Sequence, residues 1–350
     1  MRTHLAQGLR WAPWLLLGAL GVYLLVQGSD FILHLGIVTA IYAVLAMSLN
    51  LAFGYTGLFS IAHASLFGIG AYGAGLAMSQ AGVPLAPAIL CGGLAAAMVG
   101  AAVSAIFSRL EGPYFAIGTF ALGELVRIVL NEWRGLTGGP AGLMVPRPTG
   151  AQWMTFGLDL ANRRSFFALA LLLMGLTAAA LALLLRSRLG ARMMHVRDDP
   201  YLAASLGVGV LRTKIVAFFI SGLIAGLAGA VFGVYLQFIA PSSFSGMESV
   251  RLVMMLVIGG AGTLFGPVVG AAIIVLLPQA LRINPTDSLI LTGVILVVVV
   301  LFLPKGIVGA LSQRADAGSA RRRAERSAPC ERATGPSPIA PSSAKRVGAD

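Results

Sequence analysis

The chain has 350 residues, of which 57% are hydrophobic and only 11% are charged, and its mean hydropathy is +0.87. A soluble domain of this length needs far more polar surface, so the composition excludes a soluble protein and indicates one that crosses a membrane several times. The net charge of +12 does not indicate nucleic-acid binding, because the basic residues flank apolar runs and fill the C-terminal tail without interleaved aromatic residues.

Ten apolar runs that are candidates for membrane spans follow in chain order. They cover residues 11–27, 31–53, 61–80, 85–107, 113–131, 164–185, 214–238, 249–261, 266–282 and 286–303. We therefore predict an all-α polytopic membrane protein, with about ten transmembrane helices in residues 1–304. The first run lacks a small-residue cleavage site and is expected to remain as a span. The pair 249–261 and 266–282 could instead be one broken element that enters and leaves on the same side.

Lysine and arginine residues predict the orientation of the chain in the membrane. Six of them lie in the loop 186–214 and others fill the tail, so both segments are expected to be cytoplasmic. With the N-terminus also inside, the number of spans must be even. The loop 132–164 runs against this bias, because it carries four arginines and yet falls outside. Residues 305–350 are rich in Ala, Ser, Arg, Gly and Pro and are predicted to be a disordered, basic cytoplasmic tail.

The loop 186–214 contains the local signals of a short, capped helix. Asp199 can accept the amide protons of a first turn as its N-cap, and Pro200 suits the first helical position. Gly207 can supply the left-handed residue that ends the helix. A rigid helix between two spans is expected to be a handle for a soluble partner.

Polar residues interrupt the apolar pattern in the segment NLAFGYTGLFSIAHASLFGIGAY, residues 50–72. It places Asn50, Ser60 and His63 around a glycine-containing break. Irregular backbone at membrane depth is tolerated where it is buried in protein or lines a cavity. These residues are therefore candidates for a translocation path. The alternative is a tight loop between two spans in which His63 hydrogen-bonds a neighbour.

Charged residues inside membrane spans are costly and usually paired or facing water. Glu124 and Arg127 are three residues apart on one face of the run 113–131, so they can neutralise each other. They are candidates for the translocation path or for a structural ion pair. Glu248 and Arg251 have the same spacing near a span end, where snorkelling to the interface is the simpler account.

Glycine occurs 44 times, and several glycines are four residues apart, such as Gly222 with Gly226 and Gly229 with Gly233. In a membrane, small residues at this spacing let helices approach each other closely. We expect a compact bundle of helices.

The sequence contains no pattern of a catalytic or metal site. It lacks G-x-x-x-x-G-K-[ST], H-E-x-x-H and G-x-S-x-G, and its two cysteines do not have the spacing of metal ligands. We therefore expect no enzymatic activity, no metal and no cofactor in this chain, which argues against a membrane-embedded enzyme.

Several blocks of the sequence together resemble the LivM-type permease subunits of ABC importers for branched-chain amino acids. They are residues 50–72, quoted above, GPYFAIGTFALGELVR with LTGGPAGL (112–127 and 136–143), VRDDPYLAASLG with AFFISGLIAGLAGA (196–207 and 217–230), and LVIGGAGTLFGP (256–267). Their shared order over roughly residues 30–305 makes the resemblance specific. It implies the type II ABC importer permease fold and import of leucine, isoleucine or valine across the bacterial inner membrane.

The resemblance also implies a set of partners. They are a LivH-like second permease, two cytoplasmic ATPase subunits that bind ATP and magnesium, and a periplasmic substrate-binding protein, all assembled at the lipid bilayer. The family's coupling helix would fall on residues 199–207. The residues expected to couple to the ATPase are Arg197, Asp198, Asp199, Ala203, Ala204, Leu206 and Gly207. Here Asp-Asp-Pro stands where the family usually has a glutamate-rich stretch, so the contacts at this edge differ.

The sequence leaves two alternatives open for the function. The same machinery could import urea, a short amide or another amino acid, because related permeases share these signatures. A secondary transporter or channel that works alone would belong to another class. It usually needs intramembrane acids for ion coupling, whereas Glu124 is the only clear acid in the middle of a span. It also has no need for a capped cytoplasmic helix.

Overall fold

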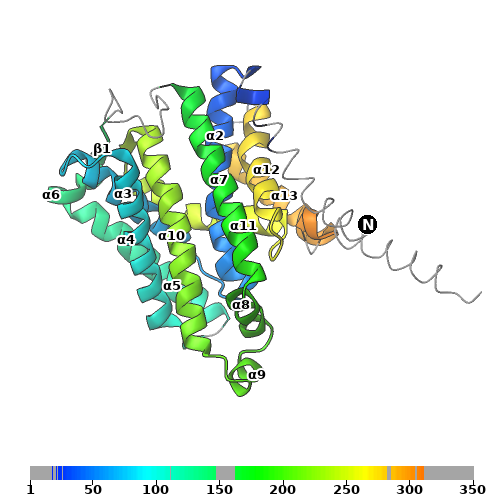
Figure 1. Cartoon of the computed structure of the whole chain (residues 1–350). Helices are drawn as coiled ribbons and strands as arrows, with labels where there is room; N and C mark the ends of the chain where they lie inside the picture. Colours follow the sequence, from blue (N-terminus) through cyan, green and yellow to red (C-terminus); the bar gives the residue numbers. More distant parts are fainter. Residues whose placement is uncertain are drawn as a thin grey trace, which may run out of the picture. The chain divides into compact units, whose positions relative to one another are not determined.

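The computed structural model of the chain is a bundle of helices (Figure 1). It describes residues 18, 21, 23–25, 27–110, 112–146, 162–281, 285–303 and 306–310. The expected first span, 11–27, lies largely outside these residues, as does the expected tail beyond residue 310. The longer helices are α2 (Asp30–Asn50), α3 (His63–Ser79), α4 (Leu85–Phe107), α5 (Pro113–Glu132), α7 (Arg163–Arg186), α10 (Val210–Leu236), α11 (Gly246–Gly259), α12 (Gly266–Ala280) and α13 (Pro285–Phe302). The shorter elements are the π-helix η1 (Leu51–Tyr55), α6 (Arg134–Thr137), η2 (Gly139–Ala141), β1 (Leu143–Met144), α8 (Arg188–Asp198), α9 (Pro200–Ser205), β2 (Phe238–Ile239) and η4 (Pro241–Phe244).

Several helices begin where the sequence supplies a local start signal. The side chains of Ser29, Asn162 and Ser187 accept a backbone N–H in the first turns of α2, α7 and α8, respectively. Pro113 is the first residue of α5, where its missing N–H costs nothing. These signals determine where the helices start, and packing determines which of their faces are buried.

Helix α2 runs through the interior of the bundle. Every side chain from Ala40 to Asn50 is buried, against α7, α10, α11 and α12. The helix then widens into η1, and the Thr56 hydroxyl donates to the Leu51 carbonyl at 2.9 Å to close it. Short π-helical segments of this kind occur frequently at functional sites.

Small residues bring α3, α4 and α10 into backbone contact. Gly70 of α3 lies against the backbone of Gly226 in α10, and Gly229 of α10 lies against the carbonyl of Phe67 in α3. A Cβ atom at Gly70 or Gly229 would overlap the neighbouring backbone. The expectation that these glycines serve close helix packing is therefore confirmed.

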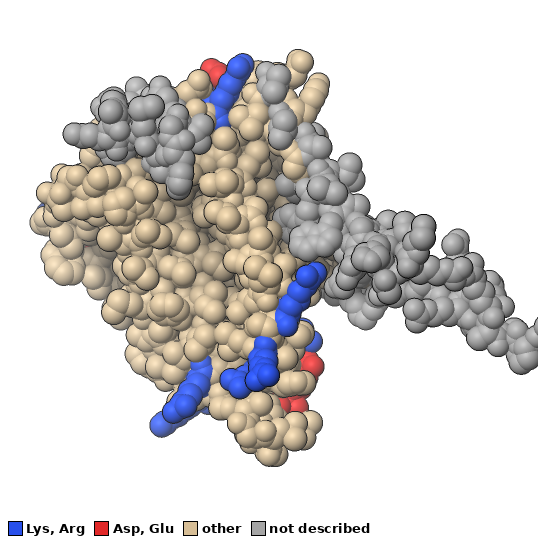
Figure 2. All heavy atoms as spheres, viewed as in Figure 1, with Lys and Arg blue, Asp and Glu red and all other residues tan. Residues whose placement is uncertain are grey.

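The two ends of the bundle carry different small elements (Figure 1). One end carries α6 and the antiparallel pair of β1 and β2, in which Leu143 faces Ile239 and Met144 faces Phe238. The opposite end carries α8 and α9. Figure 2 shows that Lys and Arg on the visible face gather at the end with α8 and α9, with a smaller group beside the start of α7. On this face, the described residues of the wide band between them show no Lys, Arg, Asp or Glu, as expected for a surface that faces lipid.

Five helical segments of the described chain are long and apolar enough to cross a membrane. They are Asp30–Tyr55, Leu85–Phe107, Pro113–Glu132, Arg163–Arg186 and Val210–Leu236. Helix α12 is apolar but has only 15 residues. A mainly helical protein with several spans is thus confirmed, whereas the total of about ten spans stays a prediction.

Helices α11 and α12 form a hairpin in which the glycine-rich segment 260–265 makes the turn. A Cβ atom at Gly54 of η1 would contact the backbone nitrogen of Gly262, so this turn lies at the end of α2 nearest to α8. Residues 306–310 are helical and Gly306 lies against Gly260, so the disorder predicted for 305–350 does not hold for these five residues.

Candidate functional site

Helix α9 has the caps that the sequence predicts. The Asp199 carboxylate accepts the N–H groups of Tyr201 and Leu202 at 2.9 and 3.0 Å, and Pro200 is the first helical residue. Gly207 has a φ of +79°. Its N–H donates to the Ala204 carbonyl at 2.9 Å, and the following N–H, of Val208, donates to Ala203 at 3.0 Å. This is the Schellman arrangement, which ends a helix rigidly.

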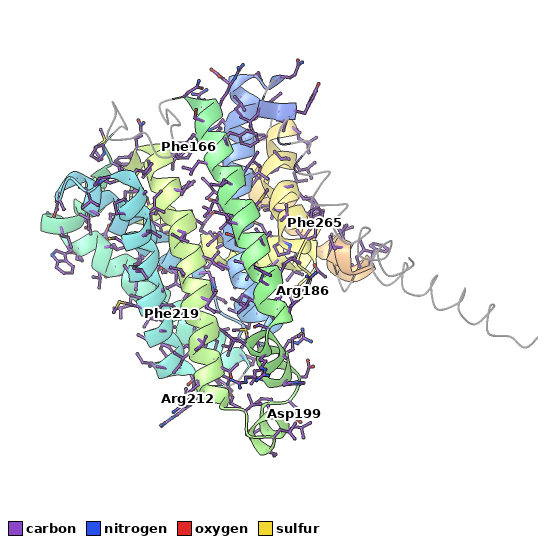
Figure 3. The ribbon with its side chains drawn as sticks, in the orientation of Figure 1. Phe166, Arg186, Asp199, Arg212, Phe219 and Phe265 are labelled. Carbon is purple, nitrogen blue, oxygen red and sulfur yellow. The ribbon has the colours of Figure 1, made fainter. Side chains whose placement is uncertain are left out.

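The exposed surface of α9 is apolar. Tyr201, Leu202 and Leu206 are 74%, 58% and 72% exposed, whereas Ala203 is buried. Figure 3 shows Asp199 at the same end of the bundle as Arg212, and well beyond Arg186. Large apolar side chains on a rigid projection, surrounded by basic residues, are typical of a protein interaction site.

Arg197, in the last turn of α8, connects this end to the interior. Its Nη1 donates to the Gly54 carbonyl of η1 at 2.8 Å. Its Nε and Nη2 donate to Oδ1 of the adjacent Asp198 at 3.0 and 2.9 Å. Gly57 lies directly against the Arg197 side chain, and a Cβ atom there would be 3.1 Å from Arg197 Cγ. Asp198 therefore holds the guanidinium in the orientation that reaches η1.

Asn50 continues the connection from η1 to the α11–α12 hairpin. Its Nδ2 donates to the Thr263 carbonyl at 2.7 Å, and its Oδ1 accepts the Gly262 N–H at 2.8 Å. The turn between α11 and α12 has no regular structure, so its backbone groups need other partners. The buried side-chain amide of Asn50 supplies a partner for one N–H and one carbonyl of this turn. The structure places Asn50 in this clamp, next to the residues of the coupling segment.

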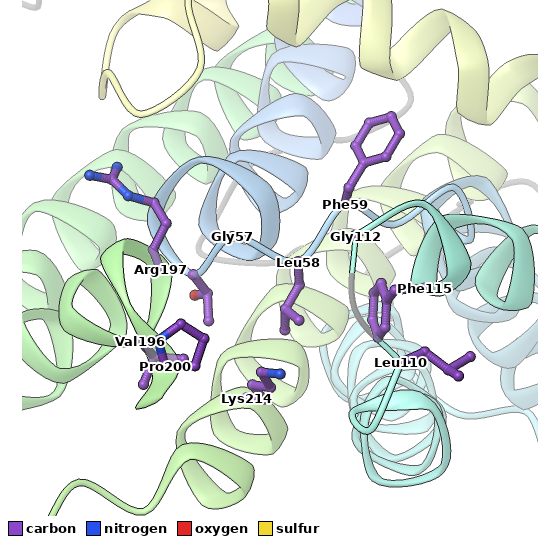
Figure 4. A pocket seen from close by; sticks show the side chains of 11 residues that line it. Gly57, Leu58, Phe59, Leu110, Gly112, Phe115, Val196, Arg197, Pro200 and Lys214 are labelled. Atoms are coloured by element: carbon purple, nitrogen blue, oxygen red, sulfur yellow. The ribbon is translucent and has the colours of Figure 1, made fainter. Parts of the chain in front are cut away.

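A small cavity lies beside this connection (Figure 4). It has a volume of about 150 Å³ and is lined by residues 56–59, Leu110, Gly112, Phe115, Val196, Arg197, Pro200 and Lys214. The Lys214 Nζ donates to the Ser108 carbonyl at 3.1 Å, so the ammonium is held at the C-terminal end of α4. The cavity lies between the residues that follow η1, the start of α5 and the junction of α8 and α9.

His63 and Ser60 are enclosed in the core. His63 Nε2 is 2.7 Å from Ser221 Oγ, and the Ser221 hydroxyl donates to the Ser48 carbonyl at 2.7 Å. Because that bond uses the only hydroxyl proton of Ser221, His63 must donate through Nε2. Ser60 Oγ accepts the Ala62 N–H at 3.2 Å. Both side chains are buried, which favours the interpretation of a hydrogen-bonded loop over a lumen lining.

Glu124 and Arg127 form the expected ion pair on α5. Arg127 Nε and Nη2 both lie 2.6 Å from Glu124 Oε1. The two side chains remain 34% and 29% exposed, within a helix that is apolar enough to span the membrane. A partly exposed ion pair in the middle of a span is unfavourable against lipid, so this face of α5 is a candidate for contact with water or with another subunit.

A second polar cluster was missed in the sequence. The Tyr42 hydroxyl of α2 donates to Glu248 Oε1 at 2.5 Å, and the Arg251 guanidinium lies over the Tyr42 ring, 5.7 Å from its centroid. Arg251 Nη1 is 3.6 Å from the same carboxylate oxygen. Glu248 and Arg251 were expected to snorkel near a span end; the structure adds that α2 holds the Glu248 carboxylate through Tyr42. A lone tyrosine in an apolar run gave no signal of this contact.

Comparisons with known proteins agree on one family. Residues 31–300 match the family model described as "Branched-chain amino acid transport system / permease component". The permease protein LivM of the high-affinity branched-chain amino acid transport system of Escherichia coli K12 is 33% identical over 289 residues, which cover 77% of this chain and 68% of that protein. LivH of the same strain is 24% identical over 77% of this chain and 91% of its own length. The autoinducer 2 import permease LsrC of Klebsiella pneumoniae is 34% identical over 29% of this chain and 30% of its own length. No solved structure matches the chain significantly.

Proposed function

Because the chain belongs to the branched-chain amino acid transport permease family, we propose that it is a transmembrane subunit of an ABC importer that moves leucine, isoleucine and valine across the bacterial inner membrane. The observation that carries the proposal is α9, a helix capped at both ends that exposes apolar side chains beyond the bundle. An importer driven by separate ATPase subunits needs such a contact surface, and a carrier that works alone does not.

The assembly that we propose contains this chain, a LivH-like second permease, two cytoplasmic ATPase subunits and a periplasmic binding protein. The similarity to both LivM and LivH supports the pairing of two related permeases. ATP and magnesium would bind to the ATPase subunits, and this chain would hold no cofactor. Its termini would be cytoplasmic, on the side of α8 and α9.

The coupling would run through the contacts at that end of the bundle. Tyr201 and its apolar neighbours would sit in a groove of the ATPase, and the caps would make α9 move as one body. Arg197 would transmit this movement to the Gly54 carbonyl, and Asn50 would pass it to the hairpin. The π-helix can absorb such a shift, because its hydrogen bonds are less regular than those of α2.

The translocation path would run along the face of α5 that carries Glu124 and Arg127. Charged side chains at the centre of a bilayer cost about 2.5–3.5 kcal/mol each even by insertion measurements. A second permease that covers this face and encloses water would remove that cost. Ser60 and His63 would then stabilise the wall behind the path and would not line it.

The experiment that tests the coupling replaces Gly207 by valine in the reconstituted importer. At a φ of +79°, a β-branched residue strains the cap of α9 by about 1–2 kcal/mol or more. We expect ATP hydrolysis to continue while leucine uptake falls. The matched control is Gly82→Val, since Gly82 has a φ of +60° and open space around it, but lies in the turn between α3 and α4.

Normal leucine uptake in the Gly207→Val importer would contradict the role of α9. The alternatives are tested in the same liposomes. Uptake of urea or a short amide in preference to leucine would change the substrate and keep the machinery. Uptake by this chain alone, without ATP, would make it an autonomous transporter.

A further inference from the structure

Two acid–arginine pairs in the described part of the chain share the same i, i+3 spacing on a helix. Glu124 and Arg127 belong to α5, and Glu248 and Arg251 belong to α11, each pair at i, i+3. All four side chains are partly exposed, by 34%, 29%, 19% and 33%. None of the four is sealed in the core, as a purely structural pair would be.

The two pairs lie close together because adjacent residues of α3 hold both helices. Ala64 N–H donates to Ser249 Oγ at 3.1 Å, and the Ser65 hydroxyl donates to the Gly123 carbonyl at 2.9 Å. Consecutive Cα atoms are ~3.8 Å apart, so the backbones next to the two glutamates lie on the order of 10 Å apart. In addition, the Phe120 ring of α5 packs against Gly246 at the start of α11.

Each pair leaves hydrogen-bonding capacity unused. Glu124 takes both contacts from Arg127 on Oε1, and Glu248 takes Tyr42 and Arg251 on its own Oε1. Among the described residues, the Oε2 atom of each glutamate accepts no hydrogen bond. Arg251 Nη1 is 3.6 Å from Glu248 Oε1, which is beyond hydrogen-bond length, and the Tyr42 hydroxyl is the nearer partner of that oxygen.

We infer that these two pairs recognise the two charges of a zwitterionic amino acid during its passage. The loosely held Arg251 binds the substrate α-carboxylate, and the free Oε2 of Glu124 accepts the α-ammonium. Arg127 and Tyr42 are positioning residues, since each holds a glutamate through a hydrogen bond. The exposed Phe120 and Met247 offer apolar surface for a branched side chain. This inference rests on the proposed function, and it gives a physical reason why the substrate would be a zwitterionic amino acid.

The charges explain why such a site suits a zwitterion. Two ion pairs are neutral as a set, and a zwitterion adds no net charge, so loading the site leaves no uncompensated charge at membrane depth. Urea or an amide carries neither charge, so Arg251 would keep only its partner Glu248 and Glu124 only its partner Arg127. An amino acid with a charged side chain would add one charge without a partner.

The test measures protection of a cysteine placed beside the two pairs. Met247→Cys is introduced into the assembled importer after Cys91 and Cys330 are replaced by serine, and the rate of maleimide labelling is followed. We expect leucine to slow labelling. Leucinamide, which lacks the carboxylate, and 4-methylpentanoate, which lacks the ammonium, should need at least about tenfold higher concentrations, because each loses a charge-assisted hydrogen bond.

Arg251→Gln should weaken protection by leucine at least tenfold and bring it to the level of leucinamide. The control is Arg163→Gln, since Arg163 has the same 3.6 Å distance to its partner Asp30 but is more exposed. Equal protection by leucine and leucinamide in the importer without the arginine substitution would overturn the inference, even if Arg251→Gln failed to assemble. If leucine is nevertheless taken up with ATP, the proposed function stands and only the zwitterion site fails.

Discussion

Arg197 is the residue at which the link between α9 and the interior can be broken with least damage. Arg197→Met keeps an apolar stem of similar length beside Gly57 and removes the N–H groups that reach Gly54 and Asp198. We expect the importer to assemble and to hydrolyse ATP when the loaded binding protein is added. The amount of leucine taken up per ATP hydrolysed should fall.

The size of the effect follows from the contacts. The pair of Arg197 with Asp198 is 39% and 65% exposed, so it contributes about 0–1 kcal/mol. The bond to the Gly54 carbonyl is charge-assisted and partly buried, and contributes about 1.5–3 kcal/mol. The coupling that this bond carries cannot exceed its free energy. Its loss should therefore lower the ratio of uptake to hydrolysis by at most about 150-fold, the factor that corresponds to 3 kcal/mol.

The assay records leucine uptake and phosphate release in the same proteoliposomes. Arg212→Met is the control, because Arg212 is an exposed arginine at the same end of the bundle (Figure 3). An unchanged ratio in Arg197→Met would refute the coupling route through η1. A parallel loss of uptake, hydrolysis and assembly would also refute it, because Arg197 would then serve the fold.

Three further predictions concern the interior. Asn50→Ala should lower the free energy of unfolding by about 2–6 kcal/mol, because it leaves two backbone groups of the α11–α12 turn unpaired. An unchanged melting temperature in detergent would contradict this. Gly229→Ala should prevent monodisperse elution from a size-exclusion column, because its methyl group overlaps a carbonyl of α3, whereas Gly175→Ala meets open space and should elute normally. Reversing the charge of Glu124 or of Arg127 alone should lower the melting temperature, and exchanging the two residues for each other should restore it. The exchange should not restore leucine uptake. Recovery of uptake as well would mean that the pair is purely structural.

The sequence predicts the elements that depend on neighbouring residues. Asp199, Pro200 and Gly207 specify α9 without reference to the rest of the chain, because caps are hydrogen bonds over two to five residues. The pairing of Glu124 with Arg127 is local in the same way, since one turn of helix brings them together. From residue 31 onward, the bounds of the predicted apolar runs also agree with the described helices within a few residues, because hydropathy acts along the chain.

The roles of the individual polar residues depend on contacts between distant segments. Asn50 was a candidate for the path, but the structure pairs it with a turn more than 200 residues away. The sequence gives no signal for Tyr42, and it predicts only that Glu248 lies near a span end. In the structure these two residues, 206 positions apart, share a hydrogen bond. Composition and spacing carry no information about such partners.

The amino-acid sequence by itself determined a helical membrane protein, its family resemblance and a capped helix in a basic loop. These properties follow from hydropathy, charge and hydrogen bonds between near neighbours. The tertiary structure decided that Arg197, Gly54 and Asn50 form one connected route, and that the pairs on α5 and α11 are brought together by α3. The physical reason is that a buried polar group needs a hydrogen-bond partner, and the partner lies on the helix that packs next to it. Which helices pack together is a property of the whole chain.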